Sequence, residues 1–142
     1  MNYKRILVPV DFSEQSQRAL STALKLWGQN LENSITLLHV HPILTVTVSD
    51  FTYIEPPQTM AKAVETAETD LRTWLKNDGM PKATTAIKVL TGDPISEIIA
   101  MSKQMDLVVM GTHGRKGVSR FLLGSVAERV VRGSECSGLV VR

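Results

Sequence analysis

The segment LVVMGTHGRKGVSRFLLGSVAERVV (residues 107–131) passes from a short apolar run through a long glycine-containing loop into an amphipathic run. The apolar run is continuous rather than alternating, which is typical of a strand covered by helices on both faces. After the loop, the apolar residues of VAERVV fall at helical spacing and form one face. The segment therefore predicts a buried strand, a loop from 111 to 125 and a helix.

The rest of the chain repeats this alternation of strand and helix. Further short apolar runs predict strands at 6–10, 35–40, 86–90 and 139–141, and amphipathic patterns predict helices at 13–27, 60–75 and 93–105. Ser13 and Asp93 are suited to cap the helices that they precede. Strands joined through helices run parallel, with right-handed crossovers. We predict one α/β domain over residues 1–142, an open, mainly parallel five-stranded sheet with helices on both faces.

Composition and charge narrow the class of protein. The 142 residues are 43% hydrophobic and 21% charged, which suits one globular domain with its own core. The net charge of +2 is spread without a block of like charges, so neither nucleic acid nor a membrane is an expected partner. The single Cys136 forms no intrachain disulfide, and the N-terminal apolar stretch is too short for a secretory signal. We expect a cytoplasmic protein.

The loop from 111 to 125 is suited to close approach of a ligand to the main chain. It contains four glycines, Gly111, Gly114, Gly117 and Gly124. Residues without a Cβ let amide groups turn inward, and a helix that starts at Gly124-Ser125 offers unpaired amides to an anion. This arrangement indicates a phosphate site; the alternative is that the glycines only mark turns. A Walker loop and a dinucleotide-binding glycine fingerprint after the first strand are both missing from the sequence.

The spacing Gly-x2-Gly-x9-Gly-Ser from Gly111 to Ser125, together with Val8-Pro9-Val10-Asp11 after the first strand, resembles the universal stress protein family in its ATP-binding form. The resemblance covers essentially the whole chain, and VVM at 108–110 and VAERV at 126–130 also look like that family. It implies a Rossmann-like (HUP-like) sheet with strand order 3-2-1-4-5, counted along the chain.

The resemblance further implies an ATP site, with Mg²⁺, at the carboxyl edge of the sheet. The adenine and ribose side would be lined by Pro9, Val10, Asp11 and Val40. The ribose and triphosphate would be bordered by Met110, Gly111, His113 and Gly114, and the phosphate donors would come from Gly124, Ser125 and Val126. Asp11 has a second interpretation, as the N-cap of the first helix.

The resemblance also implies a homodimer through the C-terminal strand, Leu139, Val140 and Val141, because that strand is expected at an open sheet edge. The family commonly has Cys-Pro-Val just before this strand, where the present chain has Cys136-Ser137-Gly138. This departure predicts a looser start to the strand and puts the geometry of the dimer in question.

Three functions are compatible with this pattern. The first is a nucleotide-sensing stress module, in which ATP changes the conformation or the dimer and an unidentified protein partner responds. The second is a slow ATPase or nucleotidyl transferase, and the third an interaction domain that binds no nucleotide. Residues 111–125 contain no Asp or Glu to hold a metal or activate a nucleophile, which favours binding over catalysis.

Two further features have an open role. His39 and His41, together with His113, have the spacing of a possible metal site, although histidines at strand ends are usually ordinary hydrogen-bonding residues. Residues 41–57 show no helical period and are predicted to form a long loop, which either covers the pocket or a partner, or lies disordered on the surface.

Overall fold

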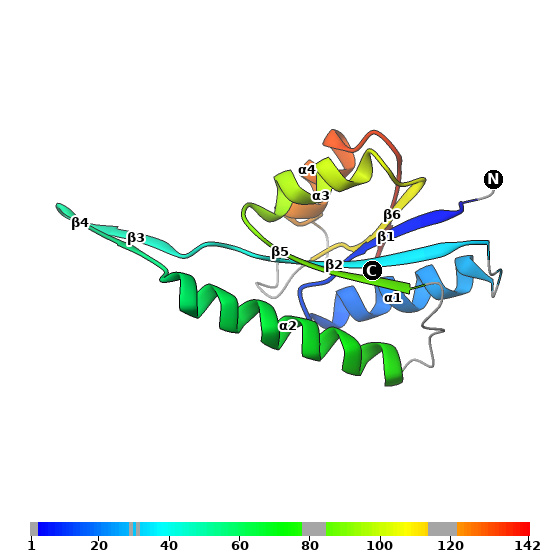
Figure 1. The fold of residues 1–142 in the computed structure, drawn as a ribbon. Helices are drawn as coiled ribbons and strands as arrows, with labels where there is room; N and C mark the ends of the chain where they lie inside the picture. Colours follow the sequence, from blue (N-terminus) through cyan, green and yellow to red (C-terminus); the bar gives the residue numbers. More distant parts are fainter. Residues whose placement is uncertain (1–2, 29, 31, 78–84, 114–121) are drawn as a thin grey trace.

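A computed structural model of the chain describes residues 3–28, 30, 32–77, 85–113 and 122–142. The predicted alternation is confirmed (Figure 1). The strands of the main sheet are β1 (Arg5–Pro9), β2 (Ser34–His41), β5 (Thr85–Thr91), β6 (Leu107–Gly111) and β7 (Ser137–Val141). The helices are α1 (Glu14–Trp27), α2 (Pro57–Asn77), α3 (Pro94–Ser102) and α4 (Ser125–Gly133).

The five strands are parallel and lie in the order β5-β2-β1-β6-β7, which is the predicted order 3-2-1-4-5. The chain winds in one direction from β1 through β2 to β5 and then returns to the other side of β1 at β6. Beside β1 the strand order therefore reverses. In an open parallel sheet, ligands bind at the carboxyl ends of the strands next to such a reversal.

Two apolar layers enclose the sheet, as the continuous strands predict. In one layer Ile6, Val8 and their neighbours pack against α1 and α2, and in the other Leu7 and Val108 pack under α3 and α4. Figure 1 shows the two helical layers on opposite sides of the strands. Successive residues of β1 point to opposite faces of the sheet, and each face is covered by helices. The residues on both faces must therefore be apolar.

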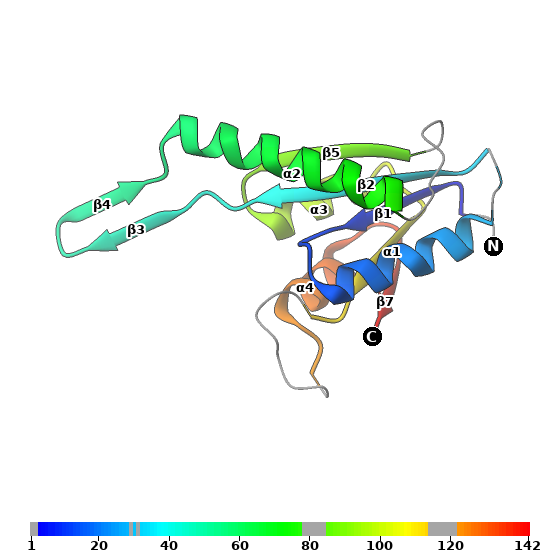
Figure 2. The ribbon, with the colours of Figure 1, turned by 90° about the horizontal axis from the view of Figure 1, so that it is seen from below.

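Residues 41–57 do not form the long loop that we expected. They contain β3 (Thr45–Val48) and β4 (Phe51–Ile54), which pair antiparallel as a separate two-stranded sheet. We call residues 45–54 the arm; it projects well beyond the main sheet in both views (Figures 1 and 2). A search for helical spacing misses it, because TVTV and FTYI carry the two-residue period of strands.

Within the described residues, no helix is both long and apolar enough to cross a bilayer. The longest helix, α2, spans 21 residues and carries charged side chains along its length.

Candidate functional site

The loop after β1 is fastened to β2 by its own main chain. The amide of Val10 donates to the carbonyl of Leu38 at 2.8 Å, and the Val10 carbonyl lies 2.7 Å from Nδ1 of His39. The Val10 side chain is buried in the layer under α1. The loop that carries the predicted ligand residues Pro9, Val10 and Asp11 is therefore held in place before any ligand arrives.

Asp11 lies at the start of α1, half-buried, and organises its cap. One oxygen of its carboxylate accepts hydrogen bonds from the amide and the hydroxyl of Ser13. Ser13 is the N-cap of α1 and accepts from the Ser16 amide at 3.2 Å. Ser13 thus caps the helix, as predicted, and Asp11 orients the capping residue.

Phe12 belongs to the same loop, and the sequence analysis did not single it out. Its φ of 62° lies in the left-handed region, which is rare for a bulky side chain and costs about 1 kcal/mol or more. The ring packs 4.9 Å from the ring of His39 and edge-on to Trp74 at 5.5 Å. These contacts hold the chain in its strained turn directly after Asp11, and no sequence pattern reveals such a φ.

Gly111 ends β6 and lets α1 approach the strand closely. A Cβ at this position would lie 2.6 Å from Cβ of Gln15 and 2.9 Å from its carbonyl carbon, so the space is already filled by the first turn of α1. The glycine is required by packing of the protein against itself. This is a reason for Gly111 other than the ligand contact that the resemblance implies.

Gly124 joins the start of α4 to the end of β6. Its amide donates to the carbonyl of Thr112 at 2.7 Å, and a Cβ on Gly124 would lie 2.7 Å from that oxygen. The Thr112 amide in turn donates to Val141 of β7 at 2.9 Å. Two amides in the predicted phosphate-binding region are therefore satisfied by protein acceptors.

The amides that follow Gly124 lie at the start of α4, where the N-cap residue has no side chain. Gly124 is the N-cap and provides no side-chain hydrogen bond, so among the described residues no capping side chain serves the amides of Ser125, Val126 and Ala127. Ser125 is exposed, and the Val126 side chain keeps 39% of its surface. Gly114, another predicted ligand residue, lies outside the described residues.

Val40 and Met110 are the next-to-last residues of β2 and β6, the strands on either side of β1. They are 8% and 6% exposed and pack in one apolar cluster under α3 and α4. His113 follows β6, half-buried, with Nδ1 2.8 Å from the Thr112 hydroxyl. The structure thus places most of the predicted site residues around the carboxyl ends of β1, β2 and β6.

Each of the three histidines contacts a different residue. His39 contacts Val10, His113 contacts Thr112, and Nε2 of His41 lies 2.9 and 3.0 Å from the carboxylate oxygens of Glu55. In the described part of the chain, no three His, Cys, Asp or Glu side chains are grouped to hold a metal ion. The thiol of Cys136 is partly buried, and desolvation raises its pKa, which opposes formation of the reactive thiolate.

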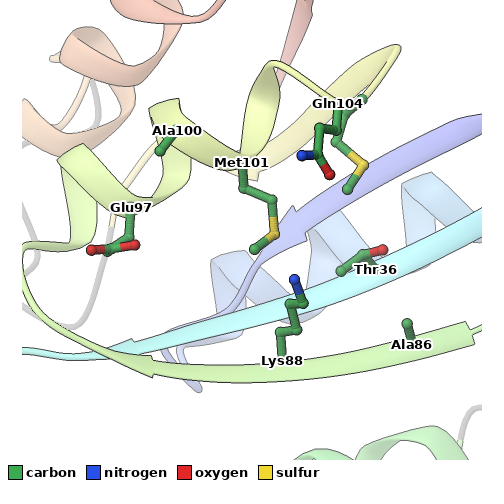
Figure 3. A pocket seen from close by; sticks show the side chains of 8 residues that line it. Thr36, Ala86, Lys88, Glu97, Ala100, Met101 and Gln104 are labelled. Atoms are coloured by element: carbon green, nitrogen blue, oxygen red, sulfur yellow. The ribbon is translucent and has the colours of Figure 1, made fainter.

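A hollow of about 290 Å³ lies elsewhere, between α3 and the strands β2 and β5 (Figure 3). Lys88 of β5 points toward Met101 of α3 across it, and Glu97 borders the hollow nearby. None of the residues predicted to bind ATP lines this space.

Fold and site together define an open, doubly wound α/β domain with a helix N-terminus at the carboxyl edge of its sheet. The model of the universal stress protein family matches residues 2–142, so the chain belongs to the universal stress protein family.

Named relatives agree with this assignment. Universal stress proteins MJ0531 and MJ0577 of Methanocaldococcus jannaschii are 34% and 30% identical, each matching 99% of this chain and 82% and 95% of their own lengths. A solved structure of MJ0577 has a TM-score of 0.77 at 25% identity, covering 99% of this chain and 96% of that one. A universal stress protein solved in complex with cAMP has a TM-score of 0.70 at 18% identity, covering 100% and 99%, which shows a shared fold.

Proposed function

We propose that this chain binds ATP, together with Mg²⁺, between the loop after β1 and the start of α4. The observation that carries the proposal is the N-terminus of α4, where Gly124 leaves the amides of Ser125, Val126 and Ala127 without a side-chain cap. Three N–H groups at the positive end of a helix dipole suit phosphate oxygens. The hydroxyl of Ser125 adds a fourth donor.

The residues around the start of α4 have different roles in the proposed triphosphate site. Because Gly124 gives its amide to Thr112, its role is to set the position of the following amides rather than to bind phosphate itself. Met110, Gly111 and His113 form the neighbouring wall at the end of β6, which Gly114 extends in the sequence. The proposal therefore assigns direct phosphate contacts to Ser125 and Val126 first.

The adenine and ribose side is assigned to the loop after β1. Asp11 is its half-buried, ligand-facing residue in the proposal, while Pro9, which ends β1, and Val10 and Val40 are buried and form the wall behind it. Ser13 fixes the position of the Asp11 carboxylate. Mg²⁺ takes carboxylate and hydroxyl oxygens alongside phosphate oxygens, so Asp11 and Ser125 are the residues that fit it.

The proposed role is nucleotide sensing in the cytoplasm. Bound ATP would stabilise one arrangement of the loops and of the dimer, which a protein partner then recognises; a ligand shifts such an equilibrium only by its differential affinity. That a universal stress protein has been solved with cAMP supports an adenine nucleotide as the ligand class in this fold. The acid-free segment 111–125 supports binding over turnover.

A homodimer through β7 is part of the same proposal. β7 is the last strand of the sheet, pairs on one side with β6, and has Leu139 36% exposed. An open edge of this kind offers unpaired N–H and C=O groups to a second copy, so Leu139, Val140 and Val141 would pair across a two-fold axis.

Two measurements on the same purified protein test the function. Nucleotide extracted after denaturation, or a rise in unfolding temperature with millimolar ATP and Mg²⁺, supports binding. Release of phosphate from labelled ATP, lost in Asp11→Ala or His113→Ala, would favour the enzyme instead. If no nucleotide is extracted and ATP causes no shift in the unfolding temperature, the proposal is overturned, and an interaction domain that binds no nucleotide is the function that remains.

A further inference from the structure

The arm has two chemically different faces. Cross-strand pairing places Val46 opposite Tyr53 and Val48 opposite Phe51, and because side chains alternate along a strand, these four lie on one face. We call them the apolar face. The other face carries Thr45, Thr47, Thr52 and Ile54, and the hydroxyls of Thr47 and Thr52 lie 3.2 Å apart there. The arm is thus an amphipathic ribbon.

The apolar face is open to solvent in the single chain. Val46 is 44% exposed, Val48 68%, Phe51 83% and Tyr53 50%. Figures 1 and 2 show the arm pointing away from the main sheet and its helices. A two-stranded hairpin is marginally stable alone in water, and its stability depends on packing of its apolar face. The fold of the arm therefore requires something to cover it.

The base of the arm is firmly fixed to the domain. The carboxylate of Glu55, 6% exposed, contacts His41 and accepts from the Leu44 amide at 3.3 Å. The Glu55 amide also donates to the Leu44 carbonyl at 2.9 Å. Both ends of the arm are joined by these bonds just before it leaves the domain. They favour an arm that stays extended over one that folds back onto its own sheet.

We propose that the apolar face of the arm packs against the same face of a second copy of this chain. Asp50, in the turn between the strands, is the one charged residue between 42 and 54, so two such faces meet without charge repulsion and offer nothing to a charged partner. A second copy of this chain carries the same uncharged apolar face and so offers a surface of matching size and chemistry. In a two-fold contact, Phe51 and Val48 of one copy pack against Phe51 and Val48 of the other.

The size of the face indicates what the contact contributes. The four exposed side chains present roughly 400 Å², given that an aromatic residue buries about 150–250 Å². A patch of this size is as large as the largest on a typical monomer, about 300–600 Å², and such patches are often functional, while a standard interface buries about 800 Å² per partner. The arm contact therefore supplies about half of a stable interface. It joins copies that are also in contact elsewhere, or gives an association that depends strongly on concentration.

The test compares one charge on each face of the arm. Phe51→Lys introduces a charge on the apolar face, and Thr52→Lys introduces the same charge one residue away on the threonine face. We expect the dissociation constant of the assembly, measured by sedimentation equilibrium, to rise at least about tenfold in Phe51→Lys and to keep the wild-type value in Thr52→Lys. A monomeric wild type, equal dissociation constants in all three proteins or an equal weakening in both variants overturns the proposal.

Cross-linking tests the proposal even if Phe51→Lys distorts the arm. Under mild oxidation, Val48→Cys should form a covalent dimer through the two-fold contact and Thr47→Cys should not; both variants keep Cys136, so that thiol contributes equally. Equal cross-linking in the two variants contradicts the face-to-face contact. ATP affinity is measured in parallel, and unchanged affinity in Phe51→Lys separates this interface from the nucleotide site.

Discussion

The Gly124 amide donates to the Thr112 carbonyl at 2.7 Å, which fixes the start of α4 against the chain leaving β6. The same approach explains why the residue is glycine, since a Cβ there would lie 2.7 Å from the Thr112 oxygen. The amides assigned to phosphate are the ones that follow. Their position therefore depends on a contact within the protein that requires glycine.

Gly124→Ala is expected to destabilise the domain by about 1–3 kcal/mol, the usual cost of an overpacked position. The φ of −61° suits any residue, so the loss comes from the clash with a backbone oxygen that cannot rotate away. Denaturant unfolding measures it. The control is Gly133→Ala at the other end of α4, where the added methyl meets the flexible end of Ile99. An equal effect in both variants would contradict this explanation.

The strained backbone of Phe12 predicts an unusual order of stabilities. Alanine and glycine at position 12 both lose the ring contacts with His39 and Trp74, but only glycine adopts a φ of 62° without cost. Phe12→Gly should therefore be more stable than Phe12→Ala by about 1 kcal/mol. Ser21, inside α1, is the control. There the alanine variant should be more stable than the glycine variant, because glycine weakens a helix interior. The strain assignment is wrong if Phe12→Ala is the more stable variant.

The Glu55–His41 pair, where the arm joins the domain, predicts that the free energy of unfolding falls in acid. The hydrogen bond from His41 lowers the pKa of Glu55 below its usual value of 4.5. A lowered pKa in the folded state adds stability above pH 4.5 that disappears as the pH falls through the lowered value. Unfolding free energy measured from pH 7 to pH 3 should thus fall more steeply in the wild type than in Glu55→Gln. Glu65→Gln, on exposed α2 surface, controls for loss of one carboxylate and should follow the wild type.

The layered fold could be predicted from sequence because the strands of the main sheet are short, mainly apolar runs, and the helices between them show helical spacing of their apolar residues. The arm was missed because its strands are short and lie outside the main sheet, where the two-residue alternation of TVTV is a weak signal. Its apolar face has no partner among the described residues.

The candidate site shows a different limit of sequence reasoning. The glycines at 111 and 124 are predicted to let a ligand approach the main chain, but the sequence does not say which protein atoms also approach there. At Gly111 it is Gln15 of α1, and at Gly124 it is Thr112, both many residues away along the chain. Likewise the strained φ of Phe12 follows from contacts with His39 and Trp74, which only the folded chain brings together.

Titration of MgATP into Ser125→Asp by calorimetry tests the central claim most directly. An aspartate in the first turn favours the helix, so the fold is retained, while its charge repels a triphosphate at the α4 amides. Thr59→Asp makes the same change in the first turn of α2, on the other side of the sheet. The account predicts affinity at least about tenfold weaker in Ser125→Asp, or about 1.4 kcal/mol, and unchanged in Thr59→Asp. Wild-type affinity in Ser125→Asp would contradict it.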